Sequence, residues 1–308
     1  MELKNHLHIP SPVSEINTSW NKDHNVRIQL KRDDLIHPLI SGNKWRKLSG
    51  IFSKFNAEHF DKIVTYGGAY SNHLVATAVV CAIQKIPCKG IVRGEEPKER
   101  NALLQLCRLY GMQIEFISRA KYKKTNRLYG VFDRELFIPE GGACHEGTLG
   151  CTHILSETNL SNVDQIYVSC GTGTTIAGMH SYLQAQNLKI PLIGIQVLKG
   201  SKYIEAELLH RFNIGNCIIY DQFHEGGYAK TNAQLIDFIH DFTVETGILL
   251  DPIYTGKMMF AIKQLIEQNA IESGKKILAI HTGGMTGWLG KGEELNYLKK
   301  TPHNIKDV

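Results

Sequence analysis

QIYVSCGTGTTIAG, residues 165–178, joins a short apolar run to a glycine-rich turn and then to the start of a helix pattern. The same order recurs where KIVTY (62–66) precedes GGAYSNH, and where KKILAI (275–280) precedes HTGGMTGWLG. Short apolar strands that alternate with helices indicate parallel sheets with helices on both faces. In such folds ligands bind at the carboxyl ends of the strands, so all three turns are predicted to lie at the ligand-binding edge.

The strand and helix patterns divide the chain into two α/β blocks, and two sheets are therefore expected. Residues 49–153 contain KIVTY, PCKGIVRG and QIEFIS with helix patterns between them, and residues 154–308 form the second block. Residues 1–48 fit either block on the pattern alone. The predicted fold class is α/β, with two open, mostly parallel twisted sheets flanked by helices.

Composition and charge narrow the class of protein. The chain has 308 residues, a formal net charge of +5 and 43% hydrophobic residues, which is ordinary for a globular protein and does not indicate nucleic-acid binding. No apolar run reaches the roughly 18 residues of a membrane span, and the N-terminus lacks a signal-peptide pattern. Seven cysteines without paired spacing fit reduced thiols in the cytoplasm.

The segment EGGACHEGTLG, residues 140–150, raises two questions. Cys144, His145, Cys151 and His153 lie close together in the sequence but match no zinc spacing, so no metal is expected. Cys144 and His145 could instead contact a substrate, or the segment could be a plain surface loop. The surface loop is the preferred interpretation.

The turn GTGTTIAG has the composition of an anion-binding cradle. It supplies two glycines, which allow close backbone approach, and three hydroxyl groups: Gly171, Gly173, Thr172, Thr174 and Thr175. The helix that follows offers free N–H groups and the positive end of its dipole. The turn lacks a Walker ending, and it lacks both the third glycine and the ribose-binding acid of a dinucleotide site. It therefore predicts a phosphate monoester site, with a ligand-free turn as the alternative.

The stretch SGNKWRKL, residues 41–48, contains a candidate reactive amine at Lys44, although an ordinary charged helix start would look the same. A lysine has a reference pKa of about 10.4, so keeping its amine neutral at pH 7 costs about 4–5 kcal/mol. The cations Arg46 and Lys47 help to lower that pKa. A lysine amine and a phosphate cradle in one pocket suggest pyridoxal phosphate, which links covalently to such an amine.

In order along the chain, SGNKWRKL, YGGAYSNH, SCGTGTTIAG, LDPIYTGK and IHTGG resemble the motifs of the D-cysteine desulfhydrase and 1-aminocyclopropane-1-carboxylate deaminase family. These are pyridoxal-phosphate enzymes with the tryptophan synthase β-like fold, fold type II. The resemblance runs from about residue 28 to residue 290. It implies a small domain, residues 49–153, inserted into a larger domain formed by residues 1–48 and 154–308. It also implies a cytoplasmic homodimer that acts on a small amino acid.

The resemblance also implies roles for individual residues. Lys44 is the lysine linked to the cofactor aldehyde, Asn72 contacts the ring hydroxyl, and Ser71 faces the substrate carboxylate or the reacting carbon. Phosphate binding falls to residues 171–175 with Lys47. The remaining expected site residues are the active-site tyrosines Tyr228 and Tyr254, the ring neighbours Thr255 and Thr282, and the substrate neighbours Tyr70 and His73. On local sequence alone, Ser71 and Asn72 are also ordinary helix caps, and each tyrosine is equally well explained by packing.

The residue after Tyr254 separates the two activities of the family. The deaminase pattern has glutamate there, whereas this chain has Thr255, as in the desulfhydrase pattern. A neutral hydroxyl gives the ring nitrogen no charge partner, so the ring is a weaker electron sink. Loss of a thiolate tolerates this better than opening of a cyclopropane. The expected reaction is β-elimination from D-cysteine to pyruvate, ammonia and sulfide.

Several alternatives stay open on the sequence. One is 1-aminocyclopropane-1-carboxylate deamination to 2-oxobutanoate and ammonia, and another is a different amino-acid substrate. Tyr70 stands where the family usually has glutamine, and LVATA follows SNH instead of the usual Arg-Gln. A nicotinamide dehydrogenase, another pyridoxal enzyme of this fold, and a non-catalytic cofactor-binding protein are the remaining candidates.

Overall fold

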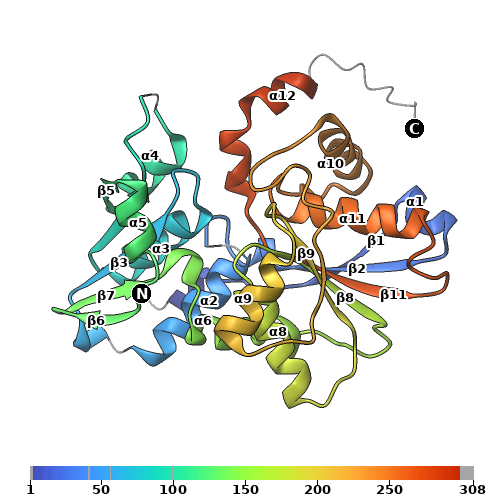
Figure 1. Cartoon of the computed structure of the whole chain (residues 1–308), viewed down its shortest axis with the longest axis horizontal. Coiled ribbons are helices and arrows are strands. Elements are labelled where there is room, and N and C mark those ends of the chain that lie inside the picture. Colours follow the sequence, from blue (N-terminus) through green and yellow to red (C-terminus); the bar gives the residue numbers. More distant parts are fainter. Residues whose placement is uncertain (1–2, 41, 56, 99, 299–308) are drawn as a thin grey trace.

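The computed structural model describes residues 3–40, 42–55, 57–98 and 100–298, and it contains two β-sheets flanked by helices (Figure 1). The larger sheet has six strands in the order β1-β2-β11-β8-β9-β10. Every neighbouring pair is parallel except β1 with β2. Its strands are β1 (Val13–Ile16), β2 (Arg27–Arg32), β8 (Gln165–Cys170), β9 (Leu192–Gln196), β10 (Ile218–Tyr220) and β11 (Lys276–His281).

The smaller sheet has five strands in the order β5-β4-β3-β7-β6. All pairs are parallel except β6 with β7. Its strands are β3 (Lys62–Gly67), β4 (Cys88–Arg93), β5 (Gln113–Ile117), β6 (Gly130–Phe132) and β7 (Glu135–Ile138). The prediction of two mostly parallel sheets with flanking helices is confirmed.

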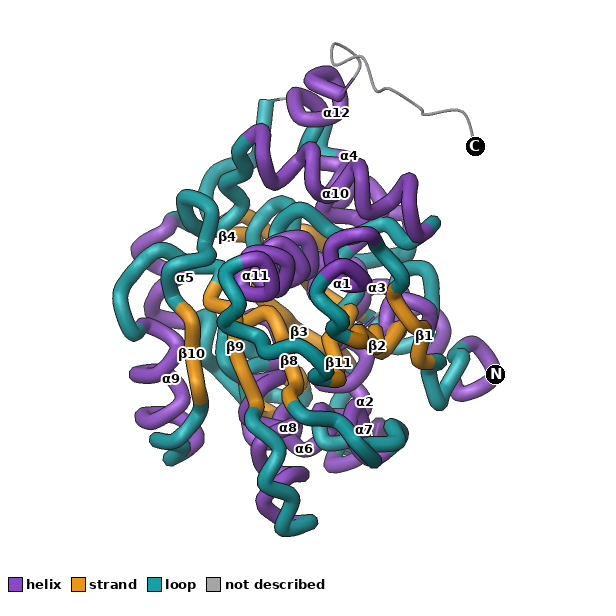
Figure 2. The backbone as a smooth tube through the Cα atoms, turned by 90° about the vertical axis from the view of Figure 1, so that its right-hand side faces the viewer, coloured by secondary structure: helices purple, strands orange, loops and turns teal. Residues whose placement is uncertain are grey.

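Helices cover both faces of the larger sheet, with α11 and α1 on one side and α8 on the other (Figure 2). Strand β11 shows why: Ile277 and Ala279 pack into one core cluster, and Leu278 and Ile280 into the opposite one. None of the described helices is long and apolar enough to cross a membrane. The helices are η1 (Leu3–His6), α1 (Ser19–Asp23), η2 (Asp33–Leu35), α2 (Gly42–Lys54), η3 (Ala57–His59), α3 (Asn72–Gln84), α4 (Ala102–Leu109), α5 (Arg119–Thr125), η4 (Glu140–Gly142), α6 (His145–Cys151), α7 (His153–Ser156), α8 (Thr174–Ala185), α9 (Tyr203–Phe212), α10 (Ala233–Thr246), α11 (Thr255–Glu267), η5 (Met285–Gly290) and α12 (Gly292–Leu298).

Helix α2 links the two parts of the molecule. Its apolar side chains Trp45, Leu48 and Ile51 belong to the core cluster of the smaller sheet. Its first residue, Gly42, instead approaches the end of β11 in the larger sheet, because a Cβ built there would lie 1.8 Å from the carbonyl oxygen of Thr282. The boundary expected at residue 48 therefore falls inside this helix, and the division into domains stays a prediction.

Candidate active site

The amine of Lys44 lies between the glycine-rich turn and a tyrosine. Its Nζ donates to Asn43 Oδ1 at 2.8 Å, and Asn43 Nδ2 donates to Thr175 Oγ1 at 3.0 Å. The same Nζ lies 5.7 Å from the ring centroid of Tyr254. Burial, and then the charge of Lys47, lower the pKa of Lys44 to about 7, while Asp251 opposes the shift. A large fraction of the amine is therefore neutral at physiological pH. Ser41, which opens this motif, lies outside the described residues.

The glycine-rich turn leaves β8 and leads directly into α8. Gly173 has φ +77° at the N-cap of α8, a conformation that glycine adopts without strain. A Cβ at Gly171 would lie 3.1 Å from Tyr254 Cε1, so the turn and this tyrosine are in contact. The hydroxyls of Thr172 and Thr174 lie 3.1 Å apart. The free N–H groups at the start of a twelve-residue helix suit an anion.

Lys47 places a second buried amine on the same helix as Lys44, with its side chain against Gly142. Its side chain is only 3% exposed, and burial is the main cause that lowers its pKa. A Cβ at Gly142 would lie 3.1 Å from Lys47 Cβ and 3.6 Å from His73 Cε1. A buried ammonium is costly unless a negative charge compensates it, so this position favours an anionic ligand.

The start of α3 carries the four residues of YSNH. Ser71 Oγ accepts a hydrogen bond from the Leu74 backbone N–H at 3.4 Å, which is the helix cap expected on the simpler interpretation. Asn72 Oδ1 accepts from the hydroxyl of Thr286. The half-exposed ring of Tyr70 lies over Gly290, where a Cβ would approach the ring to 2.8 Å. This turn is therefore packed against η5.

His73 is buried and neutral. Its Nε2 lies 2.8 Å from Thr65 Oγ1, and the Thr65 hydroxyl donates to the Ile138 carbonyl at 2.9 Å. Burial first, and then the charges of Lys44 and Lys47, lower the pKa of His73 to about 3. With 1% of the residue exposed, its expected contact with substrate stays a prediction.

Asp251 organises the turn that carries Tyr254, and the sequence analysis did not identify it. Its carboxylate accepts hydrogen bonds from the backbone N–H groups of Ile253 at 3.1 Å, Tyr254 at 3.0 Å and Thr255 at 2.6 Å. The Thr255 hydroxyl donates to the same carboxylate at 3.0 Å and accepts from the Asp251 N–H at 2.9 Å. Burial raises the pKa of Asp251, and these donors oppose that shift. Contact between Thr255 and a cofactor ring stays a prediction.

Lys257 is a second residue that the sequence analysis missed. Its buried Nζ donates to the carbonyls of His224 at 2.8 Å and Gly227 at 2.7 Å. It thereby ties α11 to the turn that precedes Tyr228. The rings of Tyr228 and Tyr254 meet edge to face, with centroids 6.3 Å apart. The only local indication of this role was the lysine itself in LDPIYTGK. The two carbonyl groups that it binds lie about thirty residues away in the sequence.

The surface-loop interpretation of residues 140–150 is wrong. Residues 145–151 form helix α6, and most of its side chains are buried between α2 and α8. Glycines make the close approach possible, since a Cβ at Gly50 would lie 2.0 Å from Glu146 O and one at Gly150 would lie 1.9 Å from Arg46 O. On the other side, a Cβ at Gly178 would lie 2.3 Å from Thr148 O. Helix α6 therefore sets the spacing between the lysine helix and the helix of the glycine-rich turn.

Arg46 anchors α2 through hydrogen bonds to two carboxylates. Its guanidinium donates two hydrogen bonds to Asp33, both at 2.9 Å, and two to Glu157, at 2.7 and 2.8 Å. The arginine and Asp33 are almost completely buried. Removal of one partner from a buried pair leaves an uncompensated charge, so this network strongly constrains the helix. Lys44 and Lys47 are thus held on a helix that is anchored by a third cation.

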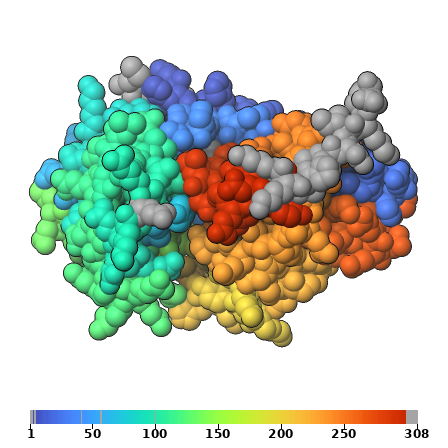
Figure 3. Space-filling view, turned by 90° about the horizontal axis from the view of Figure 1, so that it is seen from above, coloured from blue at the N-terminus to red at the C-terminus, as the bar shows by residue number. Residues whose placement is uncertain are grey.

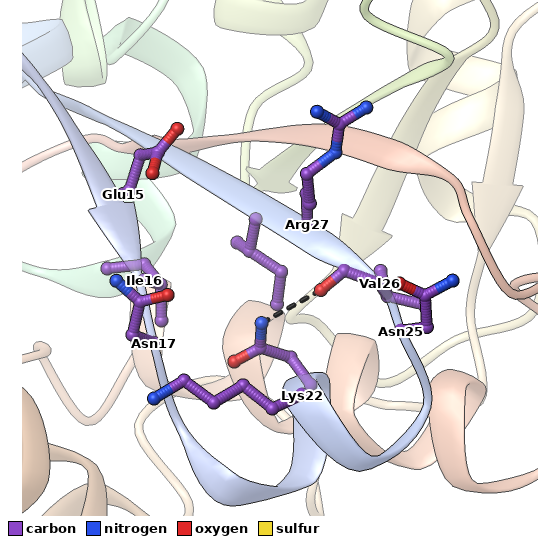
Figure 4. Close-up of a pocket in the computed structure, with 9 residues that line it drawn as sticks. Glu15, Ile16, Asn17, Lys22, Asn25, Val26 and Arg27 are labelled. Carbon is purple, nitrogen blue, oxygen red and sulfur yellow. Dashed lines mark hydrogen bonds between the residues drawn. The ribbon is translucent and has the colours of Figure 1, made fainter.

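A separate cavity of about 200 Å³ lies near α1 and β2, and none of the predicted site residues lines it (Figure 4). Its wall includes Glu15, Asn17, Lys22 and Arg27. Inside it, the Asn21 side chain donates to the Val26 carbonyl at 2.8 Å. Among the described residues, no group of three or more His, Cys, Asp or Glu side chains is placed to bind a metal ion.

The site therefore combines an amine of lowered pKa, the anion cradle that follows β8, and two tyrosines whose rings pack edge to face. The chain belongs to the pyridoxal-phosphate dependent enzyme family, whose model matches residues 7–283. It depends on pyridoxal phosphate and has the fold type II architecture, as predicted.

Two relatives and one solved structure show which activities are named among similar proteins. The chain is 30% identical to the bifunctional D-cysteine desulfhydrase/1-aminocyclopropane-1-carboxylate deaminase, mitochondrial, of Arabidopsis thaliana, over 94% of this chain and 79% of that one. It is 28% identical to the D-cysteine desulfhydrase of Serratia proteamaculans, over 83% and 86% of the two chains. A solved structure of an ACC deaminase homologue superposes with a TM-score of 0.79 at 26% identity, covering 95% of each chain.

Proposed function

We propose that this enzyme catalyses β-elimination from D-cysteine, giving pyruvate, ammonia and hydrogen sulfide with consumption of one water. The observation that carries the proposal is the hydrogen-bonded connection from the Lys44 amine through Asn43 to Thr175 of the glycine-rich turn. It joins a nucleophile to an anion cradle within one site. The relatives named D-cysteine desulfhydrase support the choice of reaction.

The family resemblance suggests the binding roles in the proposal, and the positions of Lys44 and the glycine-rich turn support them. Lys44 would bind the cofactor aldehyde covalently, and residues 171–175 with Lys47 would hold the phosphate. Asn72 would donate to the ring hydroxyl, and Thr255 and Thr282 would lie near the ring nitrogen. When bound, the cofactor supplies an electron sink for negative charge at the substrate α-carbon.

The substrate lies on the α3 side of the proposed site. Ser71, with Tyr70 and His73 nearby, forms the wall for the substrate carboxylate. The neutral amine of Lys44 takes the α-proton, for which its pKa of about 7 is well matched. Tyr228 and Tyr254 hold the leaving sulfur or the carboxylate from the other side. Deamination of 1-aminocyclopropane-1-carboxylate is the alternative reaction, supported by the second activity in the Arabidopsis relative's name.

A comparison of two substrates tests the choice of reaction. We expect pyruvate release from D-cysteine to exceed 2-oxobutanoate release from 1-aminocyclopropane-1-carboxylate, because Thr255 gives the ring nitrogen no anionic partner. Product formation at saturating substrate, measured by a coupled dehydrogenase, provides the ratio. Equal or faster turnover of the cyclopropane would reject D-cysteine elimination in favour of the alternative.

The pKa of Lys44 predicts how cofactor loading depends on pH. Only the neutral amine attacks an aldehyde, so the loading rate should rise about tenfold per pH unit below pH 7 and level off above it. Stopped-flow absorbance after mixing apoprotein with pyridoxal phosphate measures this rate. The same measurement with pyridoxal, which lacks the phosphate, shows whether ionisation of the phosphate contributes to the pH dependence. A rate that still climbs steeply at pH 9 would contradict a lowered pKa.

We further propose that the enzyme is a cytoplasmic homodimer. The family resemblance supports the dimer, and light scattering of the purified protein would measure its mass. The seven cysteines are free thiols in the structure and six of them are buried, which supports a reducing compartment.

A further inference from the structure

Two contacts join the start of α3 to η5, although the two segments are more than 200 residues apart. The Thr286 hydroxyl donates to Asn72 Oδ1. One turn further along η5, Gly290 lies under the ring of Tyr70, where a Cβ would approach the ring carbons to 2.8 Å. In the space-filling view the red C-terminal segment lies directly against the cyan small-sheet part of the chain (Figure 3). Segment η5 is therefore a contact between the two parts of the molecule at the edge of the site.

In the structure the Asn72 amide has its oxygen toward the Thr286 hydroxyl, which donates to it. A side-chain amide has one accepting end and one donating end, and they differ by a half-turn of the same group. Because Oδ1 is occupied by the Thr286 hydroxyl, Nδ2 is the end that is free to face a ligand. That nitrogen lies beside Gly284, 3.4 Å from the position of a Cβ there, in the turn that follows β11.

We propose that Thr286 is a positioning residue that presents the Asn72 N–H to the ring oxygen of pyridoxal phosphate. The inference rests on the proposed role of Asn72. An ionised ring oxygen is stabilised by an N–H donor and repelled by an amide oxygen, so the two amide orientations have opposite effects. A hydroxyl in the larger sheet's half of the site thus holds the amide on α3 in place for its N–H to face the ring oxygen.

A set of three variants tests this role with a spectroscopic signal. The visible absorbance of the cofactor-loaded protein changes with pH as the proton near the ring oxygen dissociates. Loss of an aligned N–H donor destabilises the deprotonated state, so the midpoint of this change should rise. We expect a rise in Thr286→Val, in the same direction as in Asn72→Ala, and no change in Thr286→Ser, which keeps the hydroxyl.

Cofactor affinity, measured by equilibrium dialysis, gives a second readout. One lost hydrogen bond corresponds to roughly 2- to 10-fold weaker binding in Thr286→Val, with wild-type affinity in Thr286→Ser. Circular dichroism verifies folding, and Thr286→Ala replaces the valine variant if that variant misfolds.

The possible outcomes separate this inference from the proposed function. A midpoint that rises in Asn72→Ala but stays unchanged in Thr286→Val would overturn the role of Thr286 alone. An unchanged midpoint in Asn72→Ala would show that Asn72 does not donate to the ring oxygen, and the inference would fail for that reason. Absence of cofactor absorbance in the wild-type protein after loading would instead contradict the proposed site.

Discussion

Replacement of Lys44 by alanine is expected to abolish the visible absorbance band of the cofactor and to lower turnover of D-cysteine by at least about 10²–10⁴-fold, the usual contribution of a general base. The variant loses both the amine that binds the cofactor covalently and the base proposed to take the α-proton. Borohydride reduction followed by mass analysis should mark residue 44 in the wild type and leave the variant unmodified.

Lys54→Ala is a matched control, because Lys54 lies on the same helix with its ammonium at the protein surface beside Glu146. This variant should keep the band and the activity. If Lys44→Ala still formed a borohydride-sensitive band, another amine would be the linked one. If it bound cofactor and turned over substrate normally, the proposed catalytic role would be lost.

The second large effect is expected from Gly150→Ala. The added methyl group would lie 1.9 Å from Arg46 O and 2.9 Å from Gly50 N, and both contacts are with backbone that cannot rotate away. Helices α2 and α6 must then separate, at a cost of about 1–3 kcal/mol or more in the free energy of unfolding. Because α2 carries Lys44, a displacement of about 1 Å should also reduce turnover by roughly 100-fold.

Gly292→Ala provides the corresponding control, since a Cβ at that position meets no atom within 4 Å. Its effect on the free energy of unfolding should stay within about 0.5 kcal/mol. Urea denaturation measures both variants, and activity is assayed below the transition. A Gly150→Ala protein as stable and active as the control would show that the tight contact between α2 and α6 is unnecessary.

The sequence predicted those features that are encoded locally. Apolar strands such as those ending at Gly67, Cys170 and His281 give near-continuous hydrophobic runs, because both faces of a parallel sheet are covered. The glycine-rich turns after them require unusual backbone geometry, as Gly173 illustrates. The candidate site follows because parallel strands bring their carboxyl ends to one edge.

Features that depend on distant partners could not be predicted in the same way. Asp251 is recognisable only once the turn that carries three donating N–H groups has formed. The partners of Lys257 and Thr286 lie far away in the sequence. The segment 140–150 contains four glycines and no long apolar run, so nothing local indicates a buried helix. Its burial between two other helices makes the same glycines a packing surface.

The attachments of α2 have a consequence for the position of its lysine. The helix is embedded in the core below the smaller sheet through Trp45 and Leu48, while Gly42 touches Thr282 at the end of the larger one. Between these points, Arg46 adds hydrogen bonds to Asp33 and Glu157. The backbone at Lys44 is therefore held on both sides, and the direction from which the amine reaches the glycine-rich turn is set by the packing of the whole helix.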